Sequence, residues 1–221
     1  MKEKIVNFFI FVGLFILSQV PMTVLGIFIG LNSVYKRTFS IVETVAIILV
    51  VFVIIGLTMW IAKLLKIAKW RFDYLNKKTI GMIAMGYFAC FFISMIGSTV
   101  MMIQGQTNTA NQGALDQLTK TVPTIVMLLL TVVCAPILEE IAFRGGIIRL
   151  LFPNKQLIGG IVSAVCFGLI HSPTDIGSFI IYGGLGAVLA TLFIKTKRIE
   201  VNISLHILWN AVAFGLMLLT T

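Results

Sequence analysis

The stretch IVETVAIILVVFVIIGLTMWIAKLL occupies residues 41–65 and decides the fold class. Its only charged residues are Glu43 near the start and Lys63 near the end. An α-helix needs about 20 consecutive apolar residues to cross the ~30 Å hydrocarbon core of a bilayer. Because a helix satisfies its backbone hydrogen bonds internally, this stretch is predicted to be a transmembrane helix.

Similar apolar runs lie on both sides of this stretch. The whole chain is 59% apolar and 11% charged, and its mean hydropathy is +1.06. Soluble domains carry roughly a quarter charged residues, so a chain of this composition needs lipid around it. We predict an all-α, polytopic bundle of about seven transmembrane helices in one domain, residues 1–221, with spans at 5–31, 41–65, 79–104, 122–151, 157–171, 176–194 and 201–219.

Three segments need separate interpretation. The span at 157–171 is short and ends at Ser172-Pro173, so a re-entrant segment is the alternative there. Residues 105–120 are rich in Gln, Asn and Thr and are predicted to form a polar loop. Residues 66–78 combine cations with aromatic rings, a mixture that suits the lipid headgroup region.

The Lys and Arg residues are distributed unevenly between the predicted loops. With a cytoplasmic N-terminus, fourteen of the seventeen lie on the cytoplasmic side, and only Lys36, Arg37 and Lys120 lie outside. Because cations accumulate in cytoplasmic loops, we predict a cytoplasmic N-terminus and an outward C-terminus. Membrane insertion thus explains the net charge of +9, and we predict membrane lipid, not nucleic acid, as a partner.

Two adjacent carboxylates lie inside the fourth predicted span. A charge at mid-bilayer costs at least about 2.5–3.5 kcal/mol, so Glu139 and Glu140 must face a polar interior. Arg144 follows Glu140 at i,i+4 and can pair with it. Glu139 points about 100° away on the helix and lacks this partner. It is therefore the carboxylate that could take a proton from water and return it.

The chain has two histidines, and both lie in predicted spans. His171 ends the fifth span, while His206 and Asn210 share one face of the seventh. With the carboxylates, these residues could activate water and stabilise an oxyanion on an amide carbonyl. Glu139, His171 and His206 could instead hold a divalent metal such as zinc. There is no Gly-x-Ser-x-Gly or His-Glu-x-x-His motif.

The order and spacing of these residues resemble the CPBP family of CAAX proteases and bacteriocin-processing enzymes, also called the Abi family. The resemblance rests on Glu-Glu-x-x-x-Arg at 139–144, Phe-x-x-x-His at 167–171 and His-x-x-x-Asn at 206–210. It covers the family core, residues 122–221, whereas residues 1–121 supply spans without motifs. It implies a multi-pass protein of a bacterial plasma membrane.

The resemblance also implies catalytic roles. Glu139 and His171 would activate the attacking water, His206 and Asn210 would stabilise the oxyanion, and Glu140 and Arg144 would organise the site. The function predicted is that of an intramembrane endopeptidase acting on a membrane-associated, CAAX-like or bacteriocin-type peptide. Many members of the family are labelled metalloproteases, although the glutamate–histidine mechanism needs no metal.

Two alternatives do not involve hydrolysis. One is a membrane scaffold or bacteriocin immunity protein that binds a peptide or membrane protein at the same site. The other is a small transporter or proton relay, because intramembrane Glu and His also mark proton paths. The sequence shows no internal repeat of the kind frequent in transporters.

Overall fold

The computed structural model describes residues 2–220, and this part of the chain is all-α. Within it, six helices are long and apolar enough to cross a membrane. They are α1 (Lys2–Val34), α2 (Ile41–Leu64), α3 (Lys77–Ile103), a composite helix over Thr124–Leu151, α8 (Ile176–Thr196) and α9 (Ile199–Thr220).

Six of the seven predicted spans are therefore long enough to cross a membrane, and the seventh, predicted at 157–171, is the short helix α7 (Gln156–Ile170). Its 15 residues reach only about 22 Å at 1.5 Å per residue, less than the ~30 Å hydrocarbon core. The helix ends before Pro173, as expected because proline disfavours the α conformation of its predecessor. Close packing holds α7 against α8: a Cβ on Gly168 would lie 3.0 Å from the backbone of Gly183.

The polar stretch at residues 105–120 is not only a loop, because it contains the helix α4 (Ala110–Thr119). The Thr109 hydroxyl accepts a hydrogen bond from the Gln112 N–H at 3.1 Å and caps the helix. Leu115 and Leu118 lie one turn apart and pack against a buried apolar cluster of the bundle. Tertiary packing thus stabilises a helix that the polar composition of this stretch did not predict.

The composite helix passes from α-helical to π-helical hydrogen bonding twice along its length. It consists of α5 (Thr124–Leu128), the π-helical segment η2 (Leu129–Cys134), α6 (Ala135–Glu139) and a second π-helical segment, η3 (Glu140–Leu151). Pro136 lacks a backbone N–H, and its ring would clash with a carbonyl one α-helical turn earlier. The wider π turn before it removes this conflict, and π segments are frequent at functional sites.

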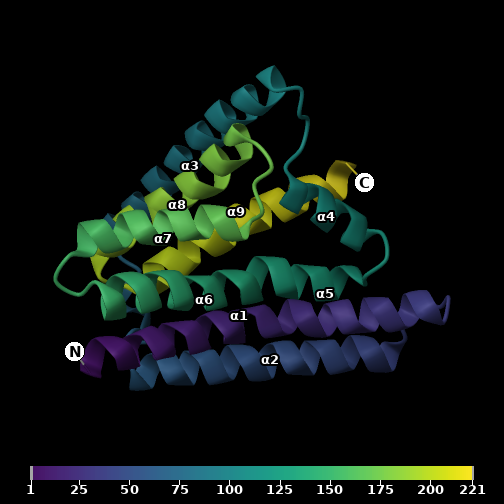
Figure 1. The fold of residues 1–221 in the computed structure, drawn as a ribbon, viewed down its shortest axis with the longest axis horizontal. Helices are drawn as coiled ribbons and strands as arrows, with labels where there is room; N and C mark the ends of the chain where they lie inside the picture. The colour runs from purple at the N-terminus through teal and green to yellow at the C-terminus, as the bar shows by residue number, and fades with distance from the viewer. Residues whose placement is uncertain (1, 221) are drawn as a thin grey trace.

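The composite helix is the centre of the bundle. Of its 18 most apolar consecutive residues, 56% are buried inside the protein, against 17–44% of the corresponding residues in the other five spans. Helices α1 and α2 lie along one side of it, and α3, α7, α8 and α9 form the other side (Figure 1). Helix α1 begins and α9 ends at opposite ends of the bundle.

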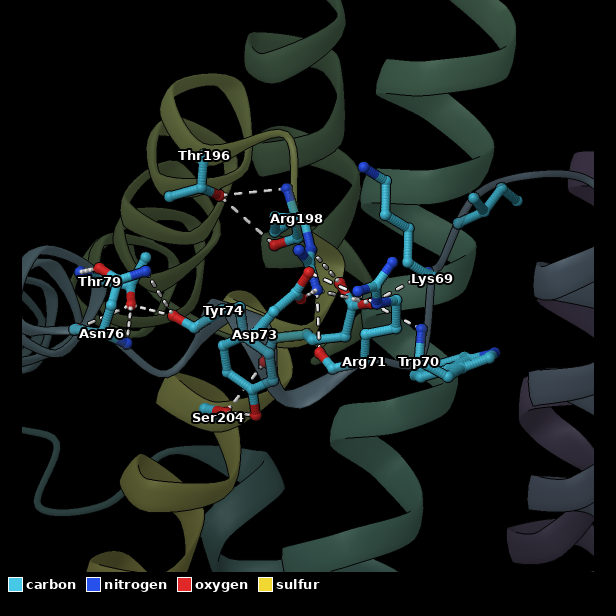
Figure 2. A network of polar contacts seen from close by, with 12 residues as sticks. Lys69, Trp70, Arg71, Asp73, Tyr74, Asn76, Thr79, Thr196, Arg198 and Ser204 are labelled. Carbon is cyan, nitrogen blue, oxygen red and sulfur yellow. Dashed lines mark hydrogen bonds and ion pairs between the residues drawn. The ribbon is translucent and has the colours of Figure 1, made fainter.

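One end of the bundle is fixed by polar contacts between the α2–α3 connection and the start of α9 (Figure 2). Glu200 accepts hydrogen bonds from the backbone N–H groups of Lys69 and Trp70 at 2.9 and 2.8 Å. Arg198 binds Asp73 at 2.8 Å and Glu200 at 3.1 Å. The basic segment predicted for the headgroup region, which includes the short 3-10 helix η1 (Phe72–Tyr74), therefore contacts the start of α9.

Candidate active site

A cavity of about 480 Å³ lies between the composite helix, α3, α8, α9 and the α4 segment. Four of the six residues singled out by the sequence line it: Glu139, His171, His206 and Asn210. The other two, Glu140 and Arg144, are fully buried behind the cavity wall. Residues from three separate motifs thus meet at one place, through helices that are distant in sequence.

Glu140 is the centre of the buried polar cluster. Its side chain has 0% exposure and lies 3.2 Å from Arg144 Nη1. His206 Nδ1 lies 2.9 Å from Glu140 Oε1, and Asn202 Nδ2 donates to Oε2 at 3.1 Å. A buried carboxylate is tolerable only when it is paired and hydrogen-bonded, and Glu140 meets both conditions.

Arg144 has contacts beyond its carboxylate partner. The guanidinium donates to the Gly186 carbonyl at 3.1 Å, which links the composite helix to α8. It also lies over the Phe167 ring of α7, at 4.6 Å from the centroid, in a cation–π contact. Arg144 therefore joins three helices around the site.

The contact with Glu140 orients the His206 ring and determines which of its nitrogens faces the cavity. An ionised carboxylate only accepts hydrogen bonds, so Nδ1 of His206 carries a proton. Nε2 then faces Glu139 Oε2 at 3.8 Å, on the cavity side. A neutral His206 has no proton on Nε2, so it can donate to an oxyanion only as an imidazolium.

Glu139 and Glu140 diverge as their spacing predicted. The Glu139 side chain is 17% exposed and lines the cavity, whereas Glu140 is sealed within the protein. One peptide step along the helix thus separates a carboxylate that a small molecule can reach from one that it cannot.

His171 follows directly after the last residue of α7. Its Nδ1 donates to the Phe167 carbonyl at 2.7 Å, because a carbonyl oxygen can only accept. In a neutral ring, Nε2 therefore carries a lone pair that can accept a proton. The ring stacks on Tyr182 of α8, with centroids 4.3 Å apart and planes at 11°.

Asn210 is held in place by an unusual feature of the composite helix. In η2 the Ala135 N–H bonds to the Leu130 carbonyl, five residues earlier. In the same register the Thr131 carbonyl would pair with residue 136, which is proline and has no N–H. Asn210 Nδ2 donates to this free carbonyl at 2.8 Å. One of its two N–H bonds is thus used for positioning, and the other remains available.

The alternative of a metal site is not supported by any set of ligands among residues 2–220. No group of three or more His, Cys, Asp and Glu side chains there is arranged to hold an ion, so Glu139, His171 and His206 do not converge as zinc ligands.

Two residues of the site were not found from the sequence. Asn202 bridges Glu140 and the Leu189 carbonyl, the latter at 2.6 Å. It precedes His206 by four residues and so lies on the same helical face, a spacing that could have revealed it. Tyr182 gave no such signal, because only the packing of α8 against α7 brings it to His171.

Comparison with known proteins identifies the family. Residues 121–212 match the family described as Type II CAAX prenyl endopeptidase Rce1-like. The UPF0177 protein YvdC of Lactococcus lactis subsp. lactis (strain IL1403) is 30% identical over 210 residues, which cover 93% of this chain and 75% of that protein. The chain belongs to the Rce1-like, or CPBP, family of type II CAAX prenyl endopeptidases.

A second relative carries an activity in its name. It is the Bacillus subtilis (strain 168) protein named "Putative membrane peptidase YdiL", 31% identical over 142 residues, which cover 61% of this chain and 57% of that protein. No solved structure matches the chain significantly. As an Rce1-like protein with several apolar helices, the chain is a multi-pass membrane protein of a peptidase family, and all six predicted site residues lie in the matched region.

Proposed function

We propose that this protein is an intramembrane endopeptidase that hydrolyses a peptide bond in a membrane-associated substrate. One observation carries the proposal: a single cavity presents the Glu139 carboxylate together with the Nε2 atoms of His171 and His206. A carboxylate and an imidazole beside enclosed space are the groups that general base catalysis on water requires.

The attacking water would bind between Glu139 and His171. Glu139 takes a proton from the water as the water oxygen bonds to the scissile carbonyl carbon, and the carbonyl oxygen becomes an oxyanion. When the C–N bond breaks, the same proton passes to the leaving amine. Glu139 and His171 thus end the cycle in the protonation states in which they began it.

The developing oxyanion would be stabilised by His206 and Asn210. His206 donates from Nε2 as an imidazolium, whose charge is balanced by the carboxylates on either side. Asn210 donates the N–H that Thr131 does not use. Donors fixed before the reaction are the usual means of oxyanion stabilisation, and here Glu140 and Arg144 hold one of them in place.

The substrate class follows from the family and from the place of the site. Membership of a peptidase family implies a peptide substrate, and the cavity lies among membrane-spanning helices, with apolar walls that include Met101, Leu130 and Phe214. A membrane-associated peptide, CAAX-like or of bacteriocin type, fits these conditions.

Hydrolysis by the purified protein tests the proposal. A quenched-fluorescence library of lipidated and unlipidated peptides would be offered to wild type and to Glu139→Gln, which keeps the side-chain shape but cannot accept a proton. General base catalysis contributes about 10²–10⁴-fold, so the variant should lose at least about 99% of turnover. The exposed Glu3→Gln is the matched control and should keep full activity. Retention of more than about a tenth of wild-type turnover by Glu139→Gln would refute the base role.

A further inference from the structure

The segment before the composite helix covers one side of the cavity. Residues 106–109, Asn111, Gln112 and Leu115 all line it, and they belong to α4 or to the turn that precedes it. Helix α4 joins the far end of α3 to the composite helix and lies near the end of α9 (Figure 1). Any peptide that enters between α4 and the bundle must displace these residues or pass beneath them.

Tyr182 connects this segment to the candidate catalytic histidine. Its hydroxyl lies 2.9 Å from Thr109 Oγ1 and accepts a hydrogen bond from Asn111 Nδ2 at 3.2 Å. Its ring stacks on His171. One side chain on α8 thus contacts the start of α4 at its polar end and the His171 imidazole with its face.

The two contacts restrict different motions of His171. The hydrogen bond from Nδ1 to the Phe167 carbonyl fixes the direction of one ring nitrogen. The ring can still turn about that direction, and the flat contact with Tyr182 opposes this turn. Together they leave Nε2 with one orientation, as the partner of Glu139 in activating water requires.

We propose that Tyr182 is a positioning residue that couples closure of α4 over the cavity to the working orientation of His171. The proposal rests on the peptidase function proposed above. With α4 in place, Thr109 and Asn111 hold the phenol, and the phenol ring holds the imidazole. When α4 moves away to admit a peptide, Tyr182 loses both partners and His171 loses its flat support. Water activation is then confined to the closed state, a known use of lids.

Three variants separate the two halves of this coupling. Tyr182→Phe keeps the ring stack but removes the contacts with α4, and Asn111→Ala removes one of those contacts from the other side. Tyr182→Leu removes the stack as well. Tyr74→Phe is the matched control, because it also deletes a tyrosine hydroxyl contact, to Ser204, at the opposite end of the bundle. Thr109 is left intact because it also caps α4.

Closure is measured without any substrate, by the labelling of a reporter cysteine. Ser94→Cys lines the cavity, and its rate of reaction with a polar maleimide reports opening, with the unsubstituted chain as the blank for its natural cysteines. Tyr182→Phe should raise this rate up to about tenfold, the effect of losing a net hydrogen-bond contribution. Asn111→Ala should raise it less and add little in the double variant. An unchanged labelling rate in Tyr182→Phe overturns the proposal that Tyr182 holds α4 closed.

The kinetic constants KM and kcat distinguish the role of Tyr182 in holding α4 closed from its role in positioning His171. Tyr182→Phe should raise KM more than it lowers kcat, whereas Tyr182→Leu should lower kcat by a further factor of about ten or more, since small misplacements cost up to about 10²-fold. A wild-type kcat in Tyr182→Leu overturns the positioning role. If the wild type cleaves no peptide, the proposed function fails, and the labelling rates still decide whether Tyr182 holds α4.

Discussion

The ion pair between Arg144 and Glu140 gives the sharpest test of the buried cluster. Both side chains have 0% exposure, and the charged atoms are 3.2 Å apart. At an effective dielectric constant of about 20, two unit charges at this distance attract by about 5 kcal/mol. Removing one partner of a buried pair costs about 3–5 kcal/mol, because the other charge is left without compensation.

Arg144→Met is the appropriate perturbation, since methionine keeps much of the length of the chain and fills irregular space. For a chain of this size, about 1 kcal/mol corresponds to a shift of about 2–4 °C in melting temperature. We therefore expect Arg144→Met to melt about 6–20 °C below wild type in detergent. Activity should fall as well, because Glu140 would no longer be held beside His206.

Two further variants make this result interpretable. Arg149→Met, five residues along the same helix, removes a cation that donates a long hydrogen bond, 3.5 Å, to the Ile67 carbonyl, and it should melt close to wild type. The double variant Glu140→Gln/Arg144→Met removes both charges and should melt above Arg144→Met alone. If Arg144→Met melts within about 2 °C of Arg149→Met, the pair contributes no stability and the reasoning is wrong.

Three further predictions address topology, the helix break and the metal. With a cytoplasmic N-terminus, Gln117→Cys should be labelled from outside intact cells and Lys69→Cys only after permeabilisation; the reverse pattern would invert the topology. Pro136→Ala restores an N–H that competes with Asn210 for its carbonyl, so kcat should fall about tenfold while Pro123→Ala keeps wild-type kcat, and equal kcat values would contradict this role. Chelators should leave wild-type activity unchanged if the site works as a glutamate–histidine pair, whereas loss of activity with its recovery on adding zinc would establish a metal.

The membrane-spanning helices were predictable because the bilayer imposes a length and a composition. The apolar run at 41–65 became α2, Ile41–Leu64, and the run at 176–194 became α8, Ile176–Thr196. Local sequence does not decide the structure where protein packing replaces lipid contact. Helix α7 is too short to span, and α4 has ten mostly polar residues, yet both form against neighbouring helices.

Within the site, contacts along one helix were predictable and contacts between helices were not. The i,i+4 spacing of Glu140 and Arg144 predicts their pairing, which the structure shows. The hydrogen bond between His206 and Glu140 joins residues that are 66 positions apart in the sequence and lie on different helices. The periodicity of apolar residues along each helix does not predict how the two helices are rotated against each other.

The cluster explains why a site of this chemistry needs residues that never reach the cavity. Glu139 must stay accessible to water, and a positive His206 beside it would be costly among membrane helices. Glu140 offsets that charge from the opposite side of the ring, at 2.9 Å, and Arg144 prevents the two carboxylates from leaving an excess of negative charge. With His206 charged, the two acids and two bases sum to zero. Removing either buried partner should therefore leave an uncompensated charge beside His206 before it changes the shape of the cavity.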